Sequence, residues 1–397
     1  MKILSLSLTN FRAFNRLEIE FADYLTLIFG KNAQGKTSVL EAVNFLSILT
    51  SPIASYDREL VNFLCLSDDQ PVSRLVATIN KIGKTHRIEV RLILDPVQNG
   101  NNRFRKEVLI DGVKRRLFDV VGFFNSVIFL PQMTRIIEDG PEERRRYLDQ
   151  TLSQAYPGYM KALSNYLQGI TKRNALLKQL SEKGGDENQL VYWDQLISEN
   201  GAILIQARNK SVLELGSIAA QKHSALTMGE ESLELIYQPS FNPWNNASPL
   251  LTLTPVVSEK SLLSTDEIQA KFQKELSGLR REEIRRGVTT IGPHRDELQF
   301  TANGVNLGVY GSRGQIRTAV MSLKLAEMEW LKEKSGELPV LLLDETLAEL
   351  DFNRRGDLLK SLENGGQVIL TTADLELFPQ DFIDRCTNLK IEDGRIS

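Results

Sequence analysis

Cysteine and histidine are scarce in this sequence. The 397 residues include two cysteines, Cys65 and Cys386, and three histidines, His86, His223 and His294. Two cysteines so far apart in the chain exclude a cysteine-built metal site and argue against a disulfide framework. Three scattered histidines likewise exclude a histidine-rich metal site.

Long hydrophobic runs and a strong net charge are also missing. No apolar run approaches the roughly 20 residues that span a bilayer, and the N-terminus lacks a signal-peptide pattern. We therefore expect a cytoplasmic protein without a membrane partner. Because the net charge is only −3, any contact with nucleic acid must come from a local basic face. The length allows two or three domains.

One stretch stands out against this ordinary composition. Residues Gly30–Thr37 read GKNAQGKT, which fits the G-x-x-x-x-G-K-[ST] spacing of a phosphate-cradling loop. A β-prone run, Tyr24–Phe29, precedes it, and apolar residues at helical spacing follow it. Glycines let the backbone wrap closely around a polyphosphate, and N–H groups at the helix start point towards its negative charge.

This loop predicts a nucleotide site that binds ATP and Mg²⁺. Lys36 would reach the β- and γ-phosphates, and the Thr37 hydroxyl would sit on Mg²⁺. The predicted loop residues are Gly30, Lys31, Asn32, Ala33, Gln34, Gly35, Lys36 and Thr37.

Two carboxylates after a buried strand supply a second part of the site. Asp344 and Glu345 follow the apolar run Val340–Leu343. In an ATPase the first would hold the Mg²⁺ water shell, and the second would act as the base for the attacking water. An acidic surface turn is the alternative, and the phosphate loop elsewhere in the chain favours the catalytic interpretation. Leu350–Asp351 fits a further loop of the same machinery.

Two other polar positions are candidates for this site. Gln132 follows the short strand Val127–Leu130 and could reach both Mg²⁺ and the attacking water, although an isolated glutamine is usually a surface residue. Ser312 and Gly314 open a long amphipathic helix, where backbone N–H groups form an anion site. Because the chain's own phosphate site lies elsewhere, this pattern indicates the γ-phosphate of a partner subunit. Taken alone, it is an ordinary helix cap.

The elements predict an α/β head interrupted by a mostly helical arm. We expect the head to comprise residues 1–140 and 288–397, and the arm residues 141–287. In the arm, Gly184–Gly185 separates two antiparallel helices, and Ser264–Glu267 is a capping box. Expected head strands lie at 3–8, 17–21, 25–29, 75–80, 86–94, 106–110, 113–118, 127–130, 298–301, 305–307, 340–343 and 368–371, with a helix around 355–362.

Together these motifs resemble the ATP-binding-cassette head shared by structural-maintenance-of-chromosomes (SMC) proteins and the RecF family, and RecF in particular. The resemblance runs nearly end to end. It rests on Leu8–Arg12, Gly30–Thr37, Pro141–Asp149, Gly292–Asp296, Ser312–Gln315, Leu342–Glu345 and Leu370–Asp374. An arm of about 150 residues is too short for the long coiled coil of a chromosome-organising protein, which also favours RecF.

The resemblance implies a slow, Mg²⁺-dependent ATPase that uses hydrolysis as a switch and forms a homodimer on ATP. Such a protein binds double-stranded DNA and single-strand/duplex junctions. With RecR, and through it RecO, it helps to load RecA at gaps. By position, Asp344 holds Mg–ATP, Glu345 is the catalytic base and Ser312 contacts ATP across the dimer. Thr372 falls at the nucleotide, where transporter ATPases carry histidine.

Two alternative functions remain, and the sequence does not decide which basic residues would contact DNA. The chain could be a related ATPase head that serves a separate nuclease or defence effector, or the ATPase of a membrane transporter; the arm and Thr372 fit the transporter less well. Basic residues that could contact DNA phosphates, in a groove between two closed heads, form four clusters. They are Arg103/Arg105/Lys106, Lys114/Arg115/Arg116, Arg144/Arg145/Arg146 and Arg280/Arg281/Arg285/Arg286.

Overall fold

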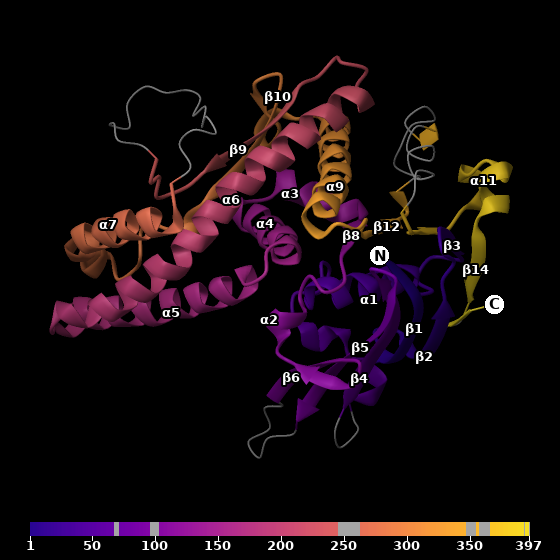
Figure 1. The fold of residues 1–397 in the computed structure, drawn as a ribbon, viewed down its shortest axis with the longest axis horizontal. Helices are drawn as coiled ribbons and strands as arrows, with labels where there is room; N and C mark the ends of the chain where they lie inside the picture. Colours follow the sequence, from indigo (N-terminus) through magenta and orange to yellow (C-terminus); the bar gives the residue numbers. More distant parts are fainter. Residues whose placement is uncertain are drawn as a thin grey trace. The chain divides into compact units, whose positions relative to one another are not determined.

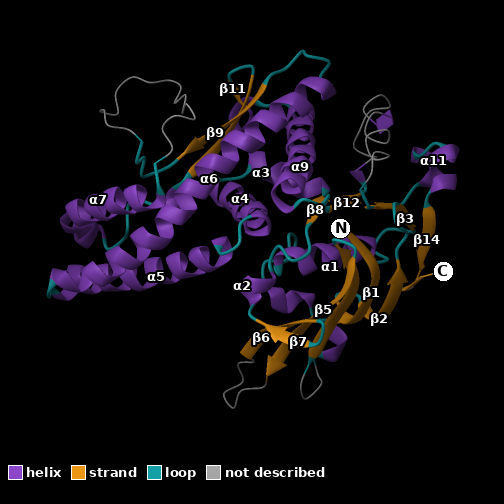
Figure 2. Cartoon of the chain, in the orientation of Figure 1, coloured by secondary structure: helices purple, strands orange, loops and turns teal. Residues whose placement is uncertain are grey.

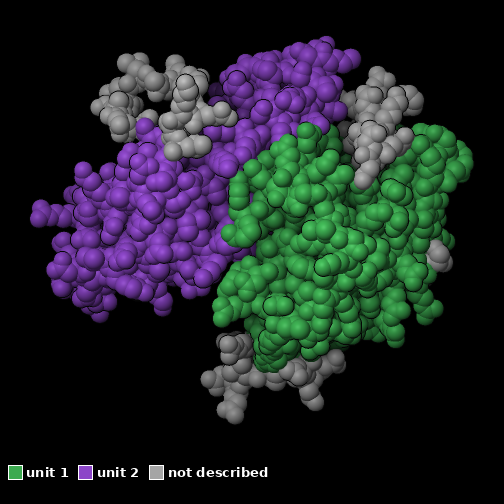
Figure 3. Space-filling model, in the orientation of Figure 1, with its two compact units in different colours: residues 1–134, 153–157, 320–397 green, residues 135–152, 158–319 purple. Residues whose placement is uncertain are grey.

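The computed structural model describes residues 1–66, 71–95, 103–244, 263–346, 355–356, 366–392 and 394–396. The chain divides into two compact units, coloured separately in Figure 3. Unit 1 comprises residues 1–134, 153–157 and 320–397, and unit 2 comprises residues 135–152 and 158–319. Leu350–Asp351, and all but the first two residues of the helix expected around 355–362, lie outside the described residues.

The first sheet of unit 1 is antiparallel and has the strand order β2-β1-β4-β5-β6-β7. Figure 1 labels all of these strands except β7. Its strands are β1 (Lys2–Phe11), β2 (Phe14–Glu20), β4 (Val72–Lys81), β5 (Lys84–Asp95), β6 (Arg103–Ile110) and β7 (Val113–Arg115). Side chains alternate between its two faces, so that Leu75, Ala77 and Ile79 of β4 are buried in the core. The residues between them lie on the opposite, outer face.

The second sheet of unit 1 is almost entirely parallel and has the order β15-β14-β3-β13-β12-β8. Its strands are β3 (Leu25–Phe29), β8 (Ser126–Phe129), β12 (Val340–Asp344), β13 (Val368–Thr372), β14 (Thr387–Glu392) and the antiparallel edge strand β15 (Arg395–Ile396). Helix α1 (Lys36–Ile48) contacts β8, β12 and β13. Every residue of those three strands is buried, which explains their continuous apolar runs.

The expected strands agree with the sequence patterns apart from two ends and the C-terminus. The strand expected at 305–307 stops at Asn306, because the short helix α8 (Leu307–Tyr310) begins at the next residue. The strand expected at 113–118 stops at Arg115, and the short helix α2 (Leu117–Val120) takes over its last residues. Patterning also missed the last elements, α11 (Gln380–Arg385), β14 and β15. Helix α11 and strand β15 are short, and β14 is mostly exposed, so none of the three shows a clear apolar pattern.

Unit 2 is mostly helical (Figure 2). The antiparallel arm helices α5 (Tyr159–Lys183) and α6 (Leu190–Leu226) pack together, and Gly184 caps α5 as expected. The predicted capping box is confirmed, because Ser264 and Glu267 exchange both of its hydrogen bonds. The remaining elements are α3 (Arg135–Glu138), α4 (Pro141–Ala155), β9 (Leu233–Gln238), α7 (Thr265–Arg286), β10 (Glu297–Ala302), β11 (Val305–Asn306), α8 (Leu307–Tyr310) and α9 (Arg313–Ser335).

The boundary between the units differs from the one expected. Residues 288–319, assigned to the head from sequence, belong to unit 2. The reason is a strand that patterning missed: β9 pairs with β10 from Leu233↔Ala302 to Gln238↔Glu297. Two helices also cross the boundary, since α4 ends and α9 continues in unit 1.

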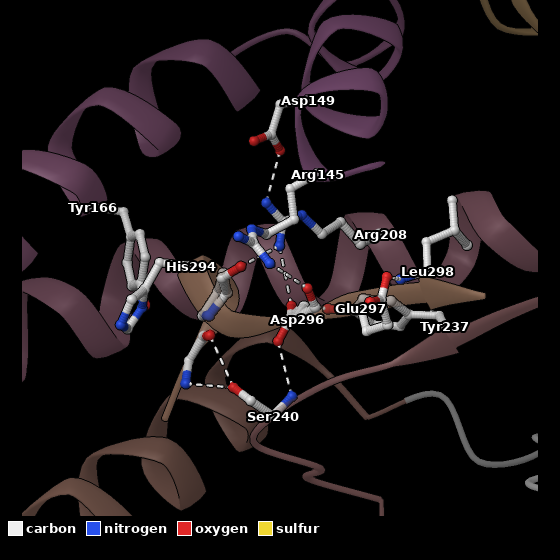
Figure 4. A network of polar contacts seen from close by, with 12 residues as sticks. Arg145, Asp149, Tyr166, Arg208, Tyr237, Ser240, His294, Asp296, Glu297 and Leu298 are labelled. Atoms are coloured by element: carbon white, nitrogen blue, oxygen red, sulfur yellow. Dashed lines mark hydrogen bonds and ion pairs between the residues drawn. The ribbon is translucent and has the colours of Figure 1, made fainter. Parts of the chain in front are cut away.

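A buried polar network occupies the interior of unit 2 (Figure 4). Arg208 of α6 donates to Asp149 Oδ1 of α4 at 2.8 Å, to Asp296 Oδ2 at 3.1 Å and to the Pro293 carbonyl at 2.6 Å. The Tyr237 hydroxyl of β9 donates to the same oxygen of Asp296. A buried guanidinium needs such partners, since an unpaired buried charge is strongly unfavourable. The Gly292–Asp296 motif is therefore a structural junction that ties α4 and α6 to the start of β10.

Arg144 and Arg145, which we expected among the DNA contacts, bind residues at the start of β10, next to this network. Arg144 forms a two-pronged ion pair with Glu297 at 2.5 and 2.8 Å, and its side chain is 13% exposed. Arg145 donates to the Asp296 carbonyl at 2.8 Å, and burial lowers the pKa of its guanidinium. Both arginines are thus committed to holding α4 against β10.

On the outer face of the first sheet, Glu89 lies between three arginines. Arg74 donates to its carboxylate at 2.9 and 3.0 Å, Arg91 at 2.7 Å, and Arg87 Nη2 lies 3.5 Å away. The hydrogen bonds from Arg74 are the main cause that lowers the pKa of Glu89 from 4.5 to about 2.

This arrangement predicts a pH dependence of stability. A carboxyl whose folded pKa is depressed stabilises the fold fully above its unfolded pKa and loses that contribution as pH falls through the folded value. Between pH 4.5 and about 2 we expect Glu89→Gln to lose about 1–2 kcal/mol less free energy of unfolding than the wild type, allowing for solvent screening around the arginines. Urea unfolding across this range measures the difference, and parallel curves would contradict it.

Candidate nucleotide-binding site

The site lies at one edge of the parallel sheet. Strands β3, β13, β12 and β8 are parallel, so their carboxyl ends meet at the same edge, where ligands commonly bind in such sheets. The chain leaves β3 at Phe29 and enters α1 at Lys36, which makes Gly30–Thr37 the connecting loop and helix start. The predicted strand, loop and helix context of this loop is confirmed.

Two glycines give the loop its close course. Gly30 has φ +155° and Gly35, which caps α1, has φ +96°. A Cβ atom at Gly30 would clash with the Ile391 carbonyl of β14, and one at Gly35 would clash with the Phe14 ring. Both positions therefore require glycine for the loop to pack against β14 and Phe14, and the helix start presents N–H groups beside Gly35.

Lys36 is folded back onto the loop. Its ammonium group donates to the Gly30 carbonyl at 2.8 Å and to the Lys31 carbonyl at 3.1 Å, and it lies 3.2 Å from Glu345 Oε1. The side chain is only 5% exposed. The cation is thus held inside the loop, at the place where phosphate charge would need it.

Thr37 and Asp344 meet at the same edge although they lie 307 residues apart. The Thr37 hydroxyl lies 3.0 and 2.9 Å from the two carboxylate oxygens of Asp344. Thr371 of β13, directly opposite Asp344 in the sheet register, donates to Oδ1 at 2.6 Å. Burial is the largest cause that raises the pKa of Asp344, with the hydrogen bonds from Thr371 and Thr37 acting against it. A buried carboxylate of this kind is suited to a cation.

Thr371 was not singled out from sequence. Its role depends on the parallel register between β12 and β13, which brings it opposite Asp344. The sequence places it one residue before Thr372, the predicted nucleotide contact. The Thr372 hydroxyl is instead buried and bonds to the backbone of Asp374, donating to the carbonyl at 2.9 Å and accepting from the N–H at 3.1 Å.

Glu345 adopts a left-handed backbone conformation with φ +48°. Its N–H donates to the Thr371 carbonyl at 3.2 Å, and its Oε2 accepts from Ala373 N at 3.1 Å. Non-glycine residues rarely occupy this conformation, and such residues cluster at functional sites. The turn aims the carboxylate back across the sheet edge towards Lys36.

Gln132 and Ser312 lie in different units. Gln132 is partly exposed in the 3₁₀ turn Pro131–Thr134 after β8, which pairs with β12, so it lies near the sheet edge that carries Asp344. Ser312 belongs to unit 2, where it caps α9: its hydroxyl accepts from Gln315 N at 3.2 Å, and Gln315 Oε1 accepts from its N–H at 3.0 Å. Ser312 and Gly314 are both exposed.

A cavity of about 430 Å³ adjoins Thr37 and Ser38 in unit 1. Ile53 and Phe63 contribute apolar surface to it, and Arg12 contributes a cation. The cavity is lined by Arg12, Ala13, Thr37, Ser38, Glu41, Ile53, Glu59, Val61 and Phe63. Arg12 is held by a two-pronged ion pair with the buried carboxylate of Glu41, at 2.6 and 2.7 Å. From sequence, Arg12 was identified only as part of the Leu8–Arg12 motif and was not predicted to lie at the nucleotide site.

These residues fit a nucleotide with Mg²⁺. Magnesium is usually held by one or two carboxylates together with substrate phosphates, and Asp344 with the Thr37 hydroxyl offers oxygen ligands of that kind. None of the helices in the described part of the chain combines the length and apolarity that a membrane span requires.

Known proteins resemble this chain over its whole length. The model of the family described as "RecF/RecN/SMC N terminal domain" matches residues 2–397. The "DNA replication and repair protein RecF" of Chloroflexus aurantiacus is 35% identical and that of Roseiflexus castenholzii 36% identical. Each alignment covers 100% of this chain and 99% of the relative.

Solved structures agree with these relatives. The structure of the recombination mediator protein RecF-ATP in the RecFOR pathway has a TM-score of 0.82 at 31% identity, covering 100% of this chain and 96% of that one. An Smc head bound to the C-winged helix domain of ScpA has a TM-score of 0.50 at 15% identity, covering 100% and 98%. At that identity the likeness extends to the fold alone.

Proposed function

Because this chain belongs to the RecF/RecN/SMC N-terminal domain family, and within it to the RecF proteins, we propose that it is an ATP-dependent, DNA-binding recombination mediator. The family and the ATP-binding-cassette head fold expected from the sequence motifs are both confirmed. The observation that carries the proposal is the meeting of Lys36, Thr37, Asp344 and Glu345 at one sheet edge.

The loop residues Gly30–Thr37 would hold the phosphates of ATP. Backbone N–H groups of the loop and of the α1 start face the negative charge, and Lys36 would exchange its carbonyl partners for phosphate oxygens. Thr37, Asp344 and Gln132 would hold Mg²⁺. When bound, this ion neutralises charge on the phosphates during transfer.

Glu345 would orient and deprotonate the attacking water. Its carboxylate is held by Ala373 N and Lys36, so it can accept a proton only after Lys36 turns to the phosphates. Glu345 would therefore become available as a base only when phosphates are bound and have drawn Lys36 away from it. We propose slow turnover, in which hydrolysis acts as a switch.

The cavity beside Thr37 would take the nucleoside. It continues from the α1 start, has apolar walls at Ile53 and Phe63, and carries Arg12 as a cation for the α-phosphate side. The ion pair with Glu41 fixes the position of this arginine.

ATP would join two copies of the chain into a dimer. Ser312 and Gly314 are exposed at the start of α9, where helix N–H groups favour an anion. They would complete the site on a second copy by contacting its γ-phosphate. As the DNA partners we propose double-stranded DNA and single-strand/duplex junctions, and RecR as the protein partner, acting with RecO and RecA in the cytoplasm.

DNA binding under nucleotide control tests this function. We expect a fluorescent duplex to bind several-fold more tightly with a non-hydrolysable ATP analogue than with ADP, because only the analogue supports the dimer. Fluorescence anisotropy with duplex, single strand and a junction, each with both nucleotides, gives the comparison. Equal affinities with ADP and the analogue would refute the switch.

A further inference from the structure

The outer face of the antiparallel sheet carries a group of arginines that no sequence motif revealed. We call Arg74, Arg87 and Arg91 the sheet-face arginine cluster. Strands β4 and β5 pair so that Arg74 lies opposite Arg91 and Thr78 lies opposite Arg87. The neighbouring side chains that point the other way are core residues, so the cluster lies on the face away from the core.

Two arginines directly opposite each other repel unless an anion lies between them. Glu89 provides that anion, but it is one carboxylate for three guanidinium groups. Its side chain is 9% exposed, whereas those of Arg74, Arg87 and Arg91 are 43%, 56% and 40% exposed. Each guanidinium has five N–H donors, so the contacts with Glu89 use only part of the hydrogen-bonding capacity of the three arginines.

The positive charge extends onto the next two strands. Arg105 of β6 pairs with Asp95 and Glu107, and Lys114 of β7 pairs with Glu107 at 2.7 Å. Within these ion pairs, five basic side chains share three carboxylates. At about 4.8 Å per strand, β4 to β7 span roughly 14 Å. That breadth suits a run of several anionic groups better than one small anion.

We propose that the sheet-face arginine cluster binds the phosphate backbone of duplex DNA. This inference rests on the proposed DNA-binding function and names the surface that carries it. Guanidinium groups pair with phosphate in a two-pronged geometry, and the neighbouring strand β1 places the small polar residues Ser7 and Thr9 on the same face, with Thr9 directly opposite Arg74. Glu89 then competes with the phosphates for the three arginines and limits the affinity.

The test compares two opposite changes of charge. In Arg87→Gln/Arg91→Gln we expect duplex affinity to fall about tenfold, and the slope of log K against log salt to fall by about two. Glu89→Gln removes the competing anion, so we expect affinity to rise roughly threefold. Arg385→Gln is the matched control, because Arg385 is an exposed arginine of α11 in the same unit, outside this sheet, and like the cluster arginines it pairs with a carboxylate, that of Asp381. All proteins are assayed by anisotropy with the non-hydrolysable ATP analogue.

The outcomes separate the surface from the function. If the wild type binds duplex and the double variant keeps both its affinity and its salt slope, the surface assignment is overturned while the function stands. Weaker binding by Glu89→Gln would also overturn it, since a purely structural ion pair loses rather than gains by that change. Failure of the wild type to bind duplex at all would overturn the function and the surface together. Melting temperatures check that each variant is folded. If the double variant is unfolded, the duplex affinity of Glu89→Gln alone tests the surface assignment.

Discussion

Lys36→Ala should abolish nucleotide binding, with a loss of affinity of about 100-fold or more. The ammonium group is the one cation that the loop encloses in the described structure, and it is held by two loop carbonyls within 3.1 Å. Charge-assisted hydrogen bonds to phosphate are each worth roughly 1.5–3 kcal/mol, and alanine removes all of them. Titration calorimetry with a non-hydrolysable ATP analogue measures the loss.

A thermal-shift control separates lost binding from lost folding. The wild type should melt at a higher temperature with saturating analogue, because a ligand that binds only the folded state stabilises it. Lys36→Ala should melt near the nucleotide-free wild type and show no shift. Lys84→Ala, which removes an exposed lysine from the β4–β5 hairpin of the same unit, should retain the full shift. A normal shift in Lys36→Ala would contradict the role given to this side chain.

The parts of the site that sequence predicted are those that a short stretch specifies. The phosphate loop is contiguous in sequence. Gly30 and Gly35 have φ values of +155° and +96° that other residues rarely adopt, so the spacing of these glycines identifies the loop. Asp344 ends and Glu345 follows a strand that is buried on both faces, and its apolar residues give a strong signal. Their meeting with Thr37 follows from the rule that parallel strands end at one edge.

The parts that sequence missed depend on register between distant segments. Thr371 gains its role by standing opposite Asp344, and the sheet-face arginine cluster exists only because β4 and β5 pair in one particular register. A shift of one residue would turn those arginines into the core. Strand β9 was missed because it forms by pairing with β10, which lies beyond the α7 segment in the chain. Pairing with that partner moved the unit boundary.

Glu345→Gln should leave nucleotide binding intact and slow hydrolysis by about 10²–10⁴-fold. Glutamine has the same shape and can still accept the hydrogen bond from Ala373 N, but its amide cannot take a proton from water. The substitution also removes the negative partner of Lys36 at 3.2 Å, which frees the lysine for phosphate. Release of inorganic phosphate measures the rate. Glu376→Gln, an exposed carboxylate shortly after β13, is the matched control and should hydrolyse ATP normally.

The same variant tests the dimer. If Ser312 of a second copy completes the site, ATP that is bound but not hydrolysed keeps two copies joined. Light scattering of Glu345→Gln with saturating ATP should therefore give the mass of a dimer, and Ser312→Arg in the same background should return it to a monomer because the exposed cap is blocked. A monomer of Glu345→Gln under these conditions would refute trapping. Fast hydrolysis by Glu345→Gln would instead remove Glu345 as the base and leave the loop as a binding site whose catalyst lies elsewhere.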